Sequence, residues 1–360
     1  MRFVPLGGFL GAGKTTTMVA AGRRIEEAGS TVSVVTNDQG VDLVDTSVAA
    51  ASLGDVSEVT GGCFCCKFDD LAAVVTRLTH EVHPDVVLAE AVGSCTDLQS
   101  TVIRPLRHFY GDDLHVAPLT VLVDPMRYAG LSTFWDDPST EPDLAYLFRH
   151  QLDEADIIAV NKSDLLSPAE TTRVRDQVQR RFPHAHVVTC SAATGDGLDE
   201  LVSLWTTSSS SDHTPFTVDY QRYGAAEAEL AWTNQTLTLR ADASFTPADW
   251  VRHVLTALSA AAAADDITIG HVKIRLTSPD GTTKASLTGA GAQPTFDEQS
   301  WVPTRSAEVV LNARVQTSPD RLDALIGRCL AAADTAAGAD SGARSGDIFR
   351  PGFPEPVLRM

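Results

Sequence analysis

The sequence predicts an α/β fold with a mostly parallel, doubly wound sheet, followed by a smaller C-terminal α+β domain of ferredoxin-like type. The first observation is a glycine-rich loop, residues 8–15, between a short β-like run and a helical run. The second is a series of β-branched runs that end in polar residues, an arrangement that doubly wound sheets use at their carboxyl edge. The third is a polar segment, residues 206–214, after which a new pattern of strands and two helices begins.

Length and composition also indicate two domains. The chain has 360 residues, 43% of them hydrophobic, which is enough to bury a large core. The low-complexity segment 206–214 is typical of a linker. We therefore expect a first domain over residues 1–205, a second over residues 215–335 and a tail over residues 336–360.

Charge and cysteine usage exclude several classes of protein. The formal net charge of −19 opposes binding to nucleic acid or to an anionic membrane surface, because both need a cationic face. No run of about 18 or more apolar residues appears, and the glycine-rich loop begins too near Met1 to leave room for a signal peptide. Six cysteines are too few for a disulfide framework, and three of them fall within four residues. The sequence predicts a cytoplasmic protein with metal or redox chemistry.

Residues 8–15 form a complete G-x-x-x-x-G-K-[ST] phosphate loop. Glycines let successive backbone N–H groups curl around phosphate oxygens, Lys14 supplies a positive charge, and the Thr15 hydroxyl is a ligand for Mg²⁺. Residues 2–6 are typical of the strand before such a loop and residues 16–28 of the helix after it, so the helix N-terminus faces the phosphates. The pattern predicts a phosphate-loop NTPase, with the nucleotide bound by Gly8, Gly11, Ala12, Gly13, Lys14, Thr15 and Thr16.

Two acidic residues follow predicted strands and are candidates for the Mg²⁺ site. Asp38 follows a β-branched run, and an acid at that position either holds Mg²⁺ or forms a turn. Glu90 follows a buried run, and Gly93 lies three residues on, where its N–H can sense a γ-phosphate. With Lys14, these two carboxylates are the predicted catalytic groups.

The stretch Gly61-Gly62-Cys63-Phe64-Cys65-Cys66 carries a second chemistry. The two glycines free the backbone to bend, so the three thiols can converge on one ion. Soft thiolates favour Zn²⁺, Co²⁺, Cu⁺ or an iron–sulfur centre over Mg²⁺ or Ca²⁺. A reversible disulfide within the same run is the rival interpretation, and buried packing thiols are the ordinary alternative.

Cys95 lies two residues after Gly93, on the segment that is expected to respond to the nucleotide. A thiolate site for Zn²⁺ needs four tetrahedral ligands, and the Cys-x-Cys-Cys run supplies three. We hypothesise that Cys95 is the fourth ligand, with a water molecule or a client residue as the alternative. Cys190 and Cys329 are expected to be packing residues.

Residues 161–164, Asn-Lys-Ser-Asp, follow another buried run and predict guanine recognition. The Asp164 carboxylate accepts from the ring N–H and the exocyclic amino group of guanine, which adenine cannot offer, while the Lys162 stem covers the ring. Ser191 and Ala192 follow the next β-branched run and supply the loop that completes such a pocket through a backbone N–H.

Beyond the linker, four strands and two helices are expected. The strands are 230–239, 267–276, 283–288 and 308–315, and the helices are 247–263 and 319–333. His271, Lys273 and Arg275 alternate with apolar residues and share one sheet face, for which a solvated outer surface is favoured over a contact surface. Residues 334–347 have the composition of a disordered segment.

Together, these motifs resemble the CobW-type metallochaperone GTPases, relatives of UreG and HypB in the SIMIBI class. The motifs are Gly8–Thr15, Asn37-Asp38-x-Gly40, Gly62-Cys63-x-Cys65-Cys66, Glu90-x-x-Gly93 and Asn161-Lys162-x-Asp164, within residues 2–205. The resemblance implies a phosphate-loop domain that hydrolyses GTP and couples hydrolysis to delivery of a transition metal. It also implies roles: Lys14 and Thr15 on phosphates and Mg²⁺, Asp38 and Glu90 around Mg²⁺, Cys63, Cys65 and Cys66 on the delivered metal, and Asn161 and Asp164 on guanine.

Two departures from the family pattern bear on the metal and the client. The family has Glu-Thr-Thr-Gly followed by Ala and Pro, whereas residues 90–95 of this chain are Glu-Ala-Val-Gly-Ser-Cys, which accommodates a different client or metal. The His-rich stretches associated with nickel are missing, which favours zinc or cobalt.

The sequence therefore predicts a metallochaperone that uses GTP, Mg²⁺ and Zn²⁺ or Co²⁺, with a client metalloprotein as partner and a homodimer across the nucleotide face. Hydrolysis by the isolated chain is expected to be slow, because no Gln follows Gly93 to orient the attacking water. Two other functions stay open. One is a GTP-binding metal or redox sensor with little turnover, and the other is a corrinoid-enzyme assembly GTPase in which the cysteines are incidental.

Overall fold

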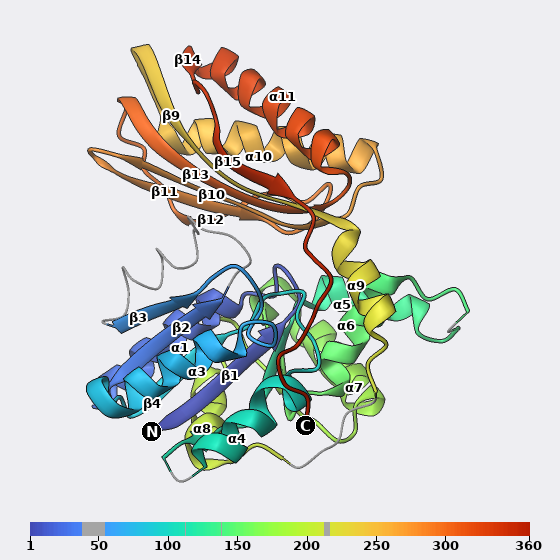
Figure 1. The fold of residues 1–360 in the computed structure, drawn as a ribbon. Coiled ribbons are helices and arrows are strands. Elements are labelled where there is room, and N and C mark those ends of the chain that lie inside the picture. The colour runs from blue at the N-terminus through green and yellow to red at the C-terminus, as the bar shows by residue number, and fades with distance from the viewer. Residues whose placement is uncertain (38–54, 112, 138, 212–216) are drawn as a thin grey trace. The chain divides into compact units, whose positions relative to one another are not determined.

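The computed structural model describes residues 1–37, 55–111, 113–137, 139–211 and 217–360 (Figure 1). The chain divides into two compact units. The first contains the described residues up to Ala226 together with Pro354–Met360, and the second contains Glu227–Phe353.

The first unit is built on a parallel sheet, with strands in the order β3-β2-β4-β1-β6-β7-β8 and β5 paired with β1. Every strand pair in it is parallel. The strands are β1 (Arg2–Gly8), β2 (Val32–Asn37), β3 (Asp55–Val59), β4 (Val86–Glu90), β5 (His115–Val116), β6 (Thr120–Val123), β7 (Ile157–Val160) and β8 (His186–Thr189). Most are short, apolar and buried along their whole length, as expected for strands covered on both faces.

Helices connect these strands or follow the last of them. They are α1 (Lys14–Glu27), α3 (Phe68–Arg77), α4 (Arg104–Tyr110), α5 (Pro125–Leu131), α6 (Asp143–Asp153), α7 (Pro168–Arg181), α8 (Leu198–Thr207) and α9 (Tyr220–Ala228). Short helical turns cover Leu78–Val82, Gln99–Ile103, Ser132–Phe134 and Ser163–Leu165. Apolar side chains of α1 and α8 pack with strand residues in one core cluster, in which the buried Trp205 also donates its indole N–H to Thr120 Oγ1 at 2.8 Å. This packing fixes α1, and with it the loop that precedes α1.

Because the strands are parallel, their carboxyl ends lie at one edge of the sheet. The phosphate loop follows β1 at this edge, and Glu90, Asn161 and Cys190 lie at or directly after the ends of β4, β7 and β8. Sequence segments that are far apart are therefore brought together by sheet order alone.

The second unit is an antiparallel sheet in the order β12-β11-β10-β13-β9-β14, with β15 also paired with β9. Its elements are β9 (Leu230–Phe245), α10 (Pro247–Ala264), β10 (Ile269–Ser278), β11 (Gly281–Leu287), β12 (Thr295–Glu298), β13 (Thr304–Gln316), α11 (Pro319–Ala337), β14 (Ala339–Asp340) and β15 (Ser345–Phe349). Figure 1 shows α10 and α11 on the same face of this sheet, where they bury one apolar cluster. The predicted α/β fold with a second, smaller α+β domain is confirmed. The order β14-β9-β13-β10, with a helix after β9 and another after β13, is that of a ferredoxin-like sandwich with one hairpin added.

The end of the chain differs from its prediction. Disorder over residues 334–347 is wrong, because α11 runs to Ala337 and β15 pairs with β9. Aromatic packing helps to hold β15 there, since the rings of Phe349 and Trp232 lie 6.2 Å apart. Two stretches also group with the first unit although the sequence assigned them to the second domain and the tail: residues 220–226 and Pro354–Met360. The first is anchored by Arg222, whose guanidinium pairs with Glu141.

The alternation predicted for β10 is confirmed, because Val272, Ile274 and Leu276 lie in the apolar cluster under the helices. The opposite face is less solvated than expected. His271 on it is buried, and Lys273 and Arg275 are half-buried. None of the helices in the described ranges combines the length and the apolar character needed to cross a bilayer.

Candidate nucleotide and thiol sites

The phosphate loop bends through three glycines with positive φ, namely Gly8, Gly11 and Gly13 at 127°, 80° and 90°. A Cβ on Gly8 would lie 2.4 Å from the backbone oxygen of Leu122, and one on Gly13 would lie 2.5 Å from Asn161 Nδ2. Glycine is therefore required at these two positions by both conformation and space. The loop ends as Lys14 begins α1, and the N-cap residue is Gly13, which has no side chain to cap the helix. Its first N–H groups are thus oriented for an anion.

Lys14 is folded back over the loop. Its Nζ donates to the Gly8 backbone oxygen at 2.9 Å and lies 3.9 Å from Glu90 Oε1. Both side chains are almost completely buried. The ammonium group is thus placed above the loop on the side of β4, where it can meet a phosphate oxygen.

The residues described around the loop fit Mg²⁺ by their donor chemistry. Thr15, the second residue of α1, is buried, and Glu90 ends β4, which is the neighbour of β1. Hydroxyl and carboxylate oxygens are hard ligands of the kind that Mg²⁺ takes. Asp38, the other predicted acid, lies outside the described residues.

Gly93 packs against the phosphate loop itself. A Cβ on Gly93 would meet Leu10 Cδ2 at 2.6 Å and the Leu10 backbone nitrogen at 3.0 Å. Gln151 of α6 holds the same segment from the other side, since its Nε2 donates to the backbone oxygens of Gly93 and Cys95 at 3.0 and 2.9 Å. Sequence reasoning missed Gln151, because nothing near it in the chain marks it as a contact of this segment.

Asn161 joins two loops of the nucleotide site. Its Nδ2 donates to the Ala12 backbone oxygen at 2.9 Å, and its Oδ1 accepts from the Ala192 N–H at 3.0 Å. The residue predicted to contact guanine therefore also organises the phosphate loop and the loop after β8. The Ala192 N–H, one of the backbone N–H groups in the loop expected to complete a base pocket, is directed to this side chain.

The other two residues predicted to recognise the base are held by neighbouring side chains. Ser191 Oγ donates to the carboxylate of the exposed Asp164 at 2.5 Å, which orients that carboxylate. Lys162 Nζ lies 2.7 Å from Asp124 Oδ2. Burial by itself raises the pKa of Asp124, but the ion pair with Lys162 and two backbone N–H donors bring that pKa below its ordinary value.

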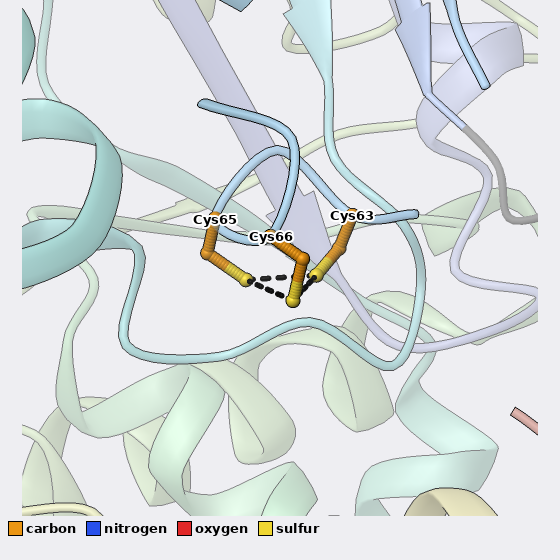
Figure 2. A group of neighbouring side chains, drawn as sticks. All are labelled: Cys63, Cys65 and Cys66. Atoms are coloured by element: carbon orange, nitrogen blue, oxygen red, sulfur yellow. Dashed lines mark hydrogen bonds between the residues drawn. The ribbon is translucent and has the colours of Figure 1, made fainter. Parts of the chain in front are cut away.

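Three thiols converge in the loop before α3 (Figure 2). The Sγ atom of Cys63 lies 2.8 Å from that of Cys65 and 3.2 Å from that of Cys66, and the latter two are 3.8 Å apart. A tight turn brings them together, because the N–H groups of Cys66 and Lys67 both donate to the Cys63 backbone oxygen. The Sγ atoms of the three cysteines therefore form a compact group. These distances are short enough for the three sulfurs to share one ion.

Cys95, in the segment that follows β4, lies against this group of three thiols. Its Sγ atom is 3.7 Å from that of Cys65, and its side chain is buried. Cys65 is thus in contact with each of the other three sulfurs. Cys63 and Cys65 are 3% and 1% exposed, and Cys66 is only half-buried, so Cys66 is the thiol that solvent reaches first.

Hydrogen bonding within the cluster raises the pKa of two of its thiols, Cys65 and Cys66. The contact with Cys63 is the main cause that raises the pKa of Cys66 to about 11. Hydrogen bonds to its neighbours, Cys63 foremost, and burial raise the pKa of Cys65 well above its ordinary value. A metal ion that binds here must therefore displace protons.

Asn37, the last residue of β2, anchors the thiol loop. Its Nδ2 donates to the backbone oxygens of Val59 and Gly62 at 2.9 and 2.7 Å, and its Oδ1 accepts from the Phe64 N–H at 2.9 Å. Sequence reasoning gave Asn37 no role, although its position directly before Asp38 at a strand end is the signal that could have found it.

The remaining cysteines stand apart from the cluster. Cys190 belongs to the core of the first unit, and burial raises its pKa to about 12. Cys329 belongs to the apolar cluster of the second unit. Their prediction as packing residues is confirmed.

Comparisons with known proteins agree with this geometry. Residues 3–189 match the family model described as the CobW/HypB/UreG nucleotide-binding domain. The chain is 31% identical over 193 residues to a zinc chaperone CobW from Sinorhizobium sp, an alignment that covers 48% of this chain and 54% of that protein. It is 27% identical over 164 residues to the zinc chaperone YeiR of Escherichia coli, covering 45% and 46% of the two chains. The chain spans about half the length of the curated relatives it matches.

Solved structures show similarity over longer stretches. Zn(II)-bound YjiA GTPase from E. coli is 15% identical, with 91% of this chain and 98% of that chain covered and a TM-score of 0.39. HypB from Helicobacter pylori in complex with nickel is 16% identical, with 59% and 90% covered and a TM-score of 0.42. Scores this low support no inference about mechanism.

Proposed function

Because this chain belongs to the CobW/HypB/UreG family, we propose that it is a GTP-hydrolysing metallochaperone that delivers a transition metal to a client metalloprotein. Zinc or cobalt is the proposed cargo. The zinc chaperones to which the chain is similar support zinc in particular. The proposed ligands are Cys63, Cys65 and Cys66, with Cys95 as the fourth.

The observation that carries this proposal is the 3.7 Å contact between the sulfurs of Cys65 and Cys95. Cys95 lies two residues after Gly93, and Gly93 packs on the phosphate loop at Leu10. A displacement of Gly93 by a γ-phosphate is therefore transmitted to a sulfur in contact with the cluster. The thiol site and the nucleotide site share one short segment of chain.

The proposed roles in the nucleotide site are supported by the positions of the described residues and, for Asp38, by the sequence motif alone. Lys14 and the N–H groups of the loop bind the phosphates, Thr15, Glu90 and Asp38 hold Mg²⁺, and Asp164 reads the guanine edge. Mg²⁺, when bound, neutralises charge on the transferring phosphoryl group. Gly93 is followed by Ser94 and Cys95, so no side chain of the kind that orients an attacking water follows directly. The proposal is that a client or a second copy completes the site and that the isolated chain hydrolyses GTP slowly.

Coupling between the two ligands tests the proposal. The affinity for Zn²⁺ should differ by about tenfold or more between the protein saturated with a non-hydrolysable GTP analogue and the protein saturated with GDP, because a cycle that loads and releases metal needs a coupling free energy of at least about 1.4 kcal/mol. Chelator competition measures the affinity, and calorimetry with the two ligands added in either order checks reciprocity. Equal Zn²⁺ affinity in both nucleotide states would refute a delivery cycle.

Cys95→Ser separates a four-thiol site from a three-thiol site. We expect Zn²⁺ affinity to fall by about tenfold or more and the nucleotide dependence to disappear, because the variant removes the one sulfur on the segment after Gly93. The visible absorption of the Co²⁺ complex should shift, since it reports the number of sulfur ligands. Cys329→Ser, in the apolar core of the second unit, is the control. Values unchanged from the wild type in both nucleotide states would remove Cys95 from the site.

One observation favours a second candidate. The 2.8 Å approach of the Cys63 and Cys65 sulfurs suits a redox-sensing module that holds GTP with little turnover. In that case oxidants would change the thiol count of the purified protein while Zn²⁺ left the GTPase rate unaltered. If the cysteines were incidental, as in a corrinoid-enzyme assembly GTPase, neither oxidants nor Zn²⁺ would change the GTPase rate.

A further inference from the structure

Residues Pro354–Met360, which we call the strap, lie along the thiol site of the first unit. The Glu355 N–H donates to Cys66 Sγ at 3.3 Å, and the Val357 N–H donates to the Cys65 backbone oxygen at 2.9 Å. The strap therefore contacts both the partly exposed thiol and the backbone of the central one. The segment is nearly 290 residues away from the cysteines in the sequence, so this is a tertiary contact that the fold has to build.

The C-terminal end of the strap is held by a pocket for the Arg359 side chain, formed by Asp97 and Tyr220. Arg359 Nε lies 2.8 Å from Asp97 Oδ2, and the Asp97 side chain is 0% exposed. The Tyr220 hydroxyl donates to the same carboxylate oxygen at 2.7 Å, and the Arg359 guanidinium lies 5.9 Å from the centre of the Tyr220 ring. A buried carboxylate requires a cation or several donors, and Arg359 supplies the cation here.

Further backbone contacts fix the register of the strap. The Met360 N–H donates to the Ser100 backbone oxygen at 2.9 Å, and Arg104 Nη1 donates to the Met360 backbone oxygen at 3.0 Å. Two prolines, Pro354 and Pro356, restrict the backbone of the strap at its thiol end, so less conformational entropy is lost when the strap docks. The strap thus bridges the thiol loop and the segment after Gly93.

We propose that Pro354–Met360 closes the thiol site in cis and that release of Arg359 from the pocket of Asp97 and Tyr220 opens Cys65 and Cys66 to metal exchange. Asp97 lies four residues after Gly93, at φ 63°, a conformation that is strained for a residue with a side chain. Movement of Gly93 with the nucleotide shifts the carboxylate that holds Arg359. The link to metal release rests on the proposed function, whereas closure of the thiols by the strap does not.

Thiol accessibility of the metal-free, reduced, full-length protein tests the closure. We compare wild type, Arg359→Ala and a chain lacking residues 354–360 in their reaction with an aromatic disulfide reagent, and mass spectrometry identifies the labelled cysteine. Labelling of Cys66 should be about tenfold faster in both variants, because protection falls as the open population rises. Arg350→Ala is the matched control, since it removes an arginine from the same end of the chain but outside the strap. It should label at the wild-type rate.

A second measurement uses bound metal. Transfer of Co²⁺ from the protein to a chelator should accelerate in Arg359→Ala by the same factor as labelling. Melting curves identify a variant that fails to fold. If the shortened chain fails to fold, the labelling rate of Arg359→Ala alone tests the closure. Labelling of Arg359→Ala at the wild-type rate would refute closure of the thiol site by the strap, whatever the nucleotide does to metal affinity. Faster labelling with nucleotide-independent metal affinity supports the strap and contradicts the delivery cycle.

Discussion

Replacing Asn161 by Ala should weaken binding of GTP by about 100-fold, since one buried and one partly buried hydrogen-bonding group lose their partner at a cost of about 1–3 kcal/mol each. The groups are the Ala12 backbone oxygen in the phosphate loop and the Ala192 N–H in the loop after β8. Without the side chain between them, both loops lose their fixed geometry before any nucleotide arrives. Binding of a fluorescent GTP analogue in the presence of Mg²⁺ measures the effect.

A matched control exists in the second unit. Asn312 is also a buried asparagine, and its Nδ2 donates to Asn234 Oδ1 at 3.0 Å. Asn312→Ala removes a comparable hydrogen bond from the other unit and should leave nucleotide affinity unchanged. If Asn161→Ala bound GTP as well as the control variant, the loops would be held by their own backbone conformation, and the bridging role of Asn161 would be wrong.

Cys65→Ser should have the largest effect on metal binding. Its sulfur is the one in contact with Cys63, Cys66 and Cys95. Structural zinc sites bind with about 10–16 kcal/mol from four ligands, so losing one thiolate should lower Zn²⁺ affinity by about 100-fold or more. Competition with a chelator of known affinity measures the loss, and the sulfur-to-metal absorption of the Co²⁺ complex should weaken in parallel.

The thiol protons give the metal measurement an internal check. Because the pKa values of Cys65 and Cys66 lie above neutrality, Zn²⁺ binding should release protons and become tighter as the pH rises toward the pKa of about 11 of Cys66. Cys65→Ser should release fewer protons than the wild type, whereas Cys329→Ser should release the same number. Wild-type Zn²⁺ affinity in Cys65→Ser would make the cluster incidental and would favour the corrinoid-enzyme alternative.

The parts of the molecule that were predictable are local in sequence. The phosphate loop needs glycines and a lysine at fixed spacing, and the thiol loop needs three cysteines within four residues, so both could be identified from the chain alone. The parallel sheet followed from buried β-branched runs that end in polar residues. In each case one stretch of chain contains the whole signal.

The missed features depend on contacts between distant residues. Gln151 reaches Gly93 from 58 positions away, and Arg359 reaches Asp97 from 262 positions away. Neither residue belongs to a motif, and each could equally have been a solvated side chain. The strand β15 was missed for the same reason, because only Ile348 and Phe349 of its five residues are apolar and the segment becomes a strand by pairing with β9. Sequence patterns alone could not reveal that β9 offers them a partner.

The pairing of β14 and β15 with β9 bears on aggregation of the protein. β9 is 16 residues long and would border the sheet of the second unit if β14 and β15 were removed. A long, exposed edge strand pairs with strands of other molecules through its free backbone groups, which leads to aggregation. Residues 339–360 thus contain two separable parts: β14 and β15, which cover the edge of β9, and the strap, which contacts the cysteines. A cut between Phe349 and Pro354 removes only the strap.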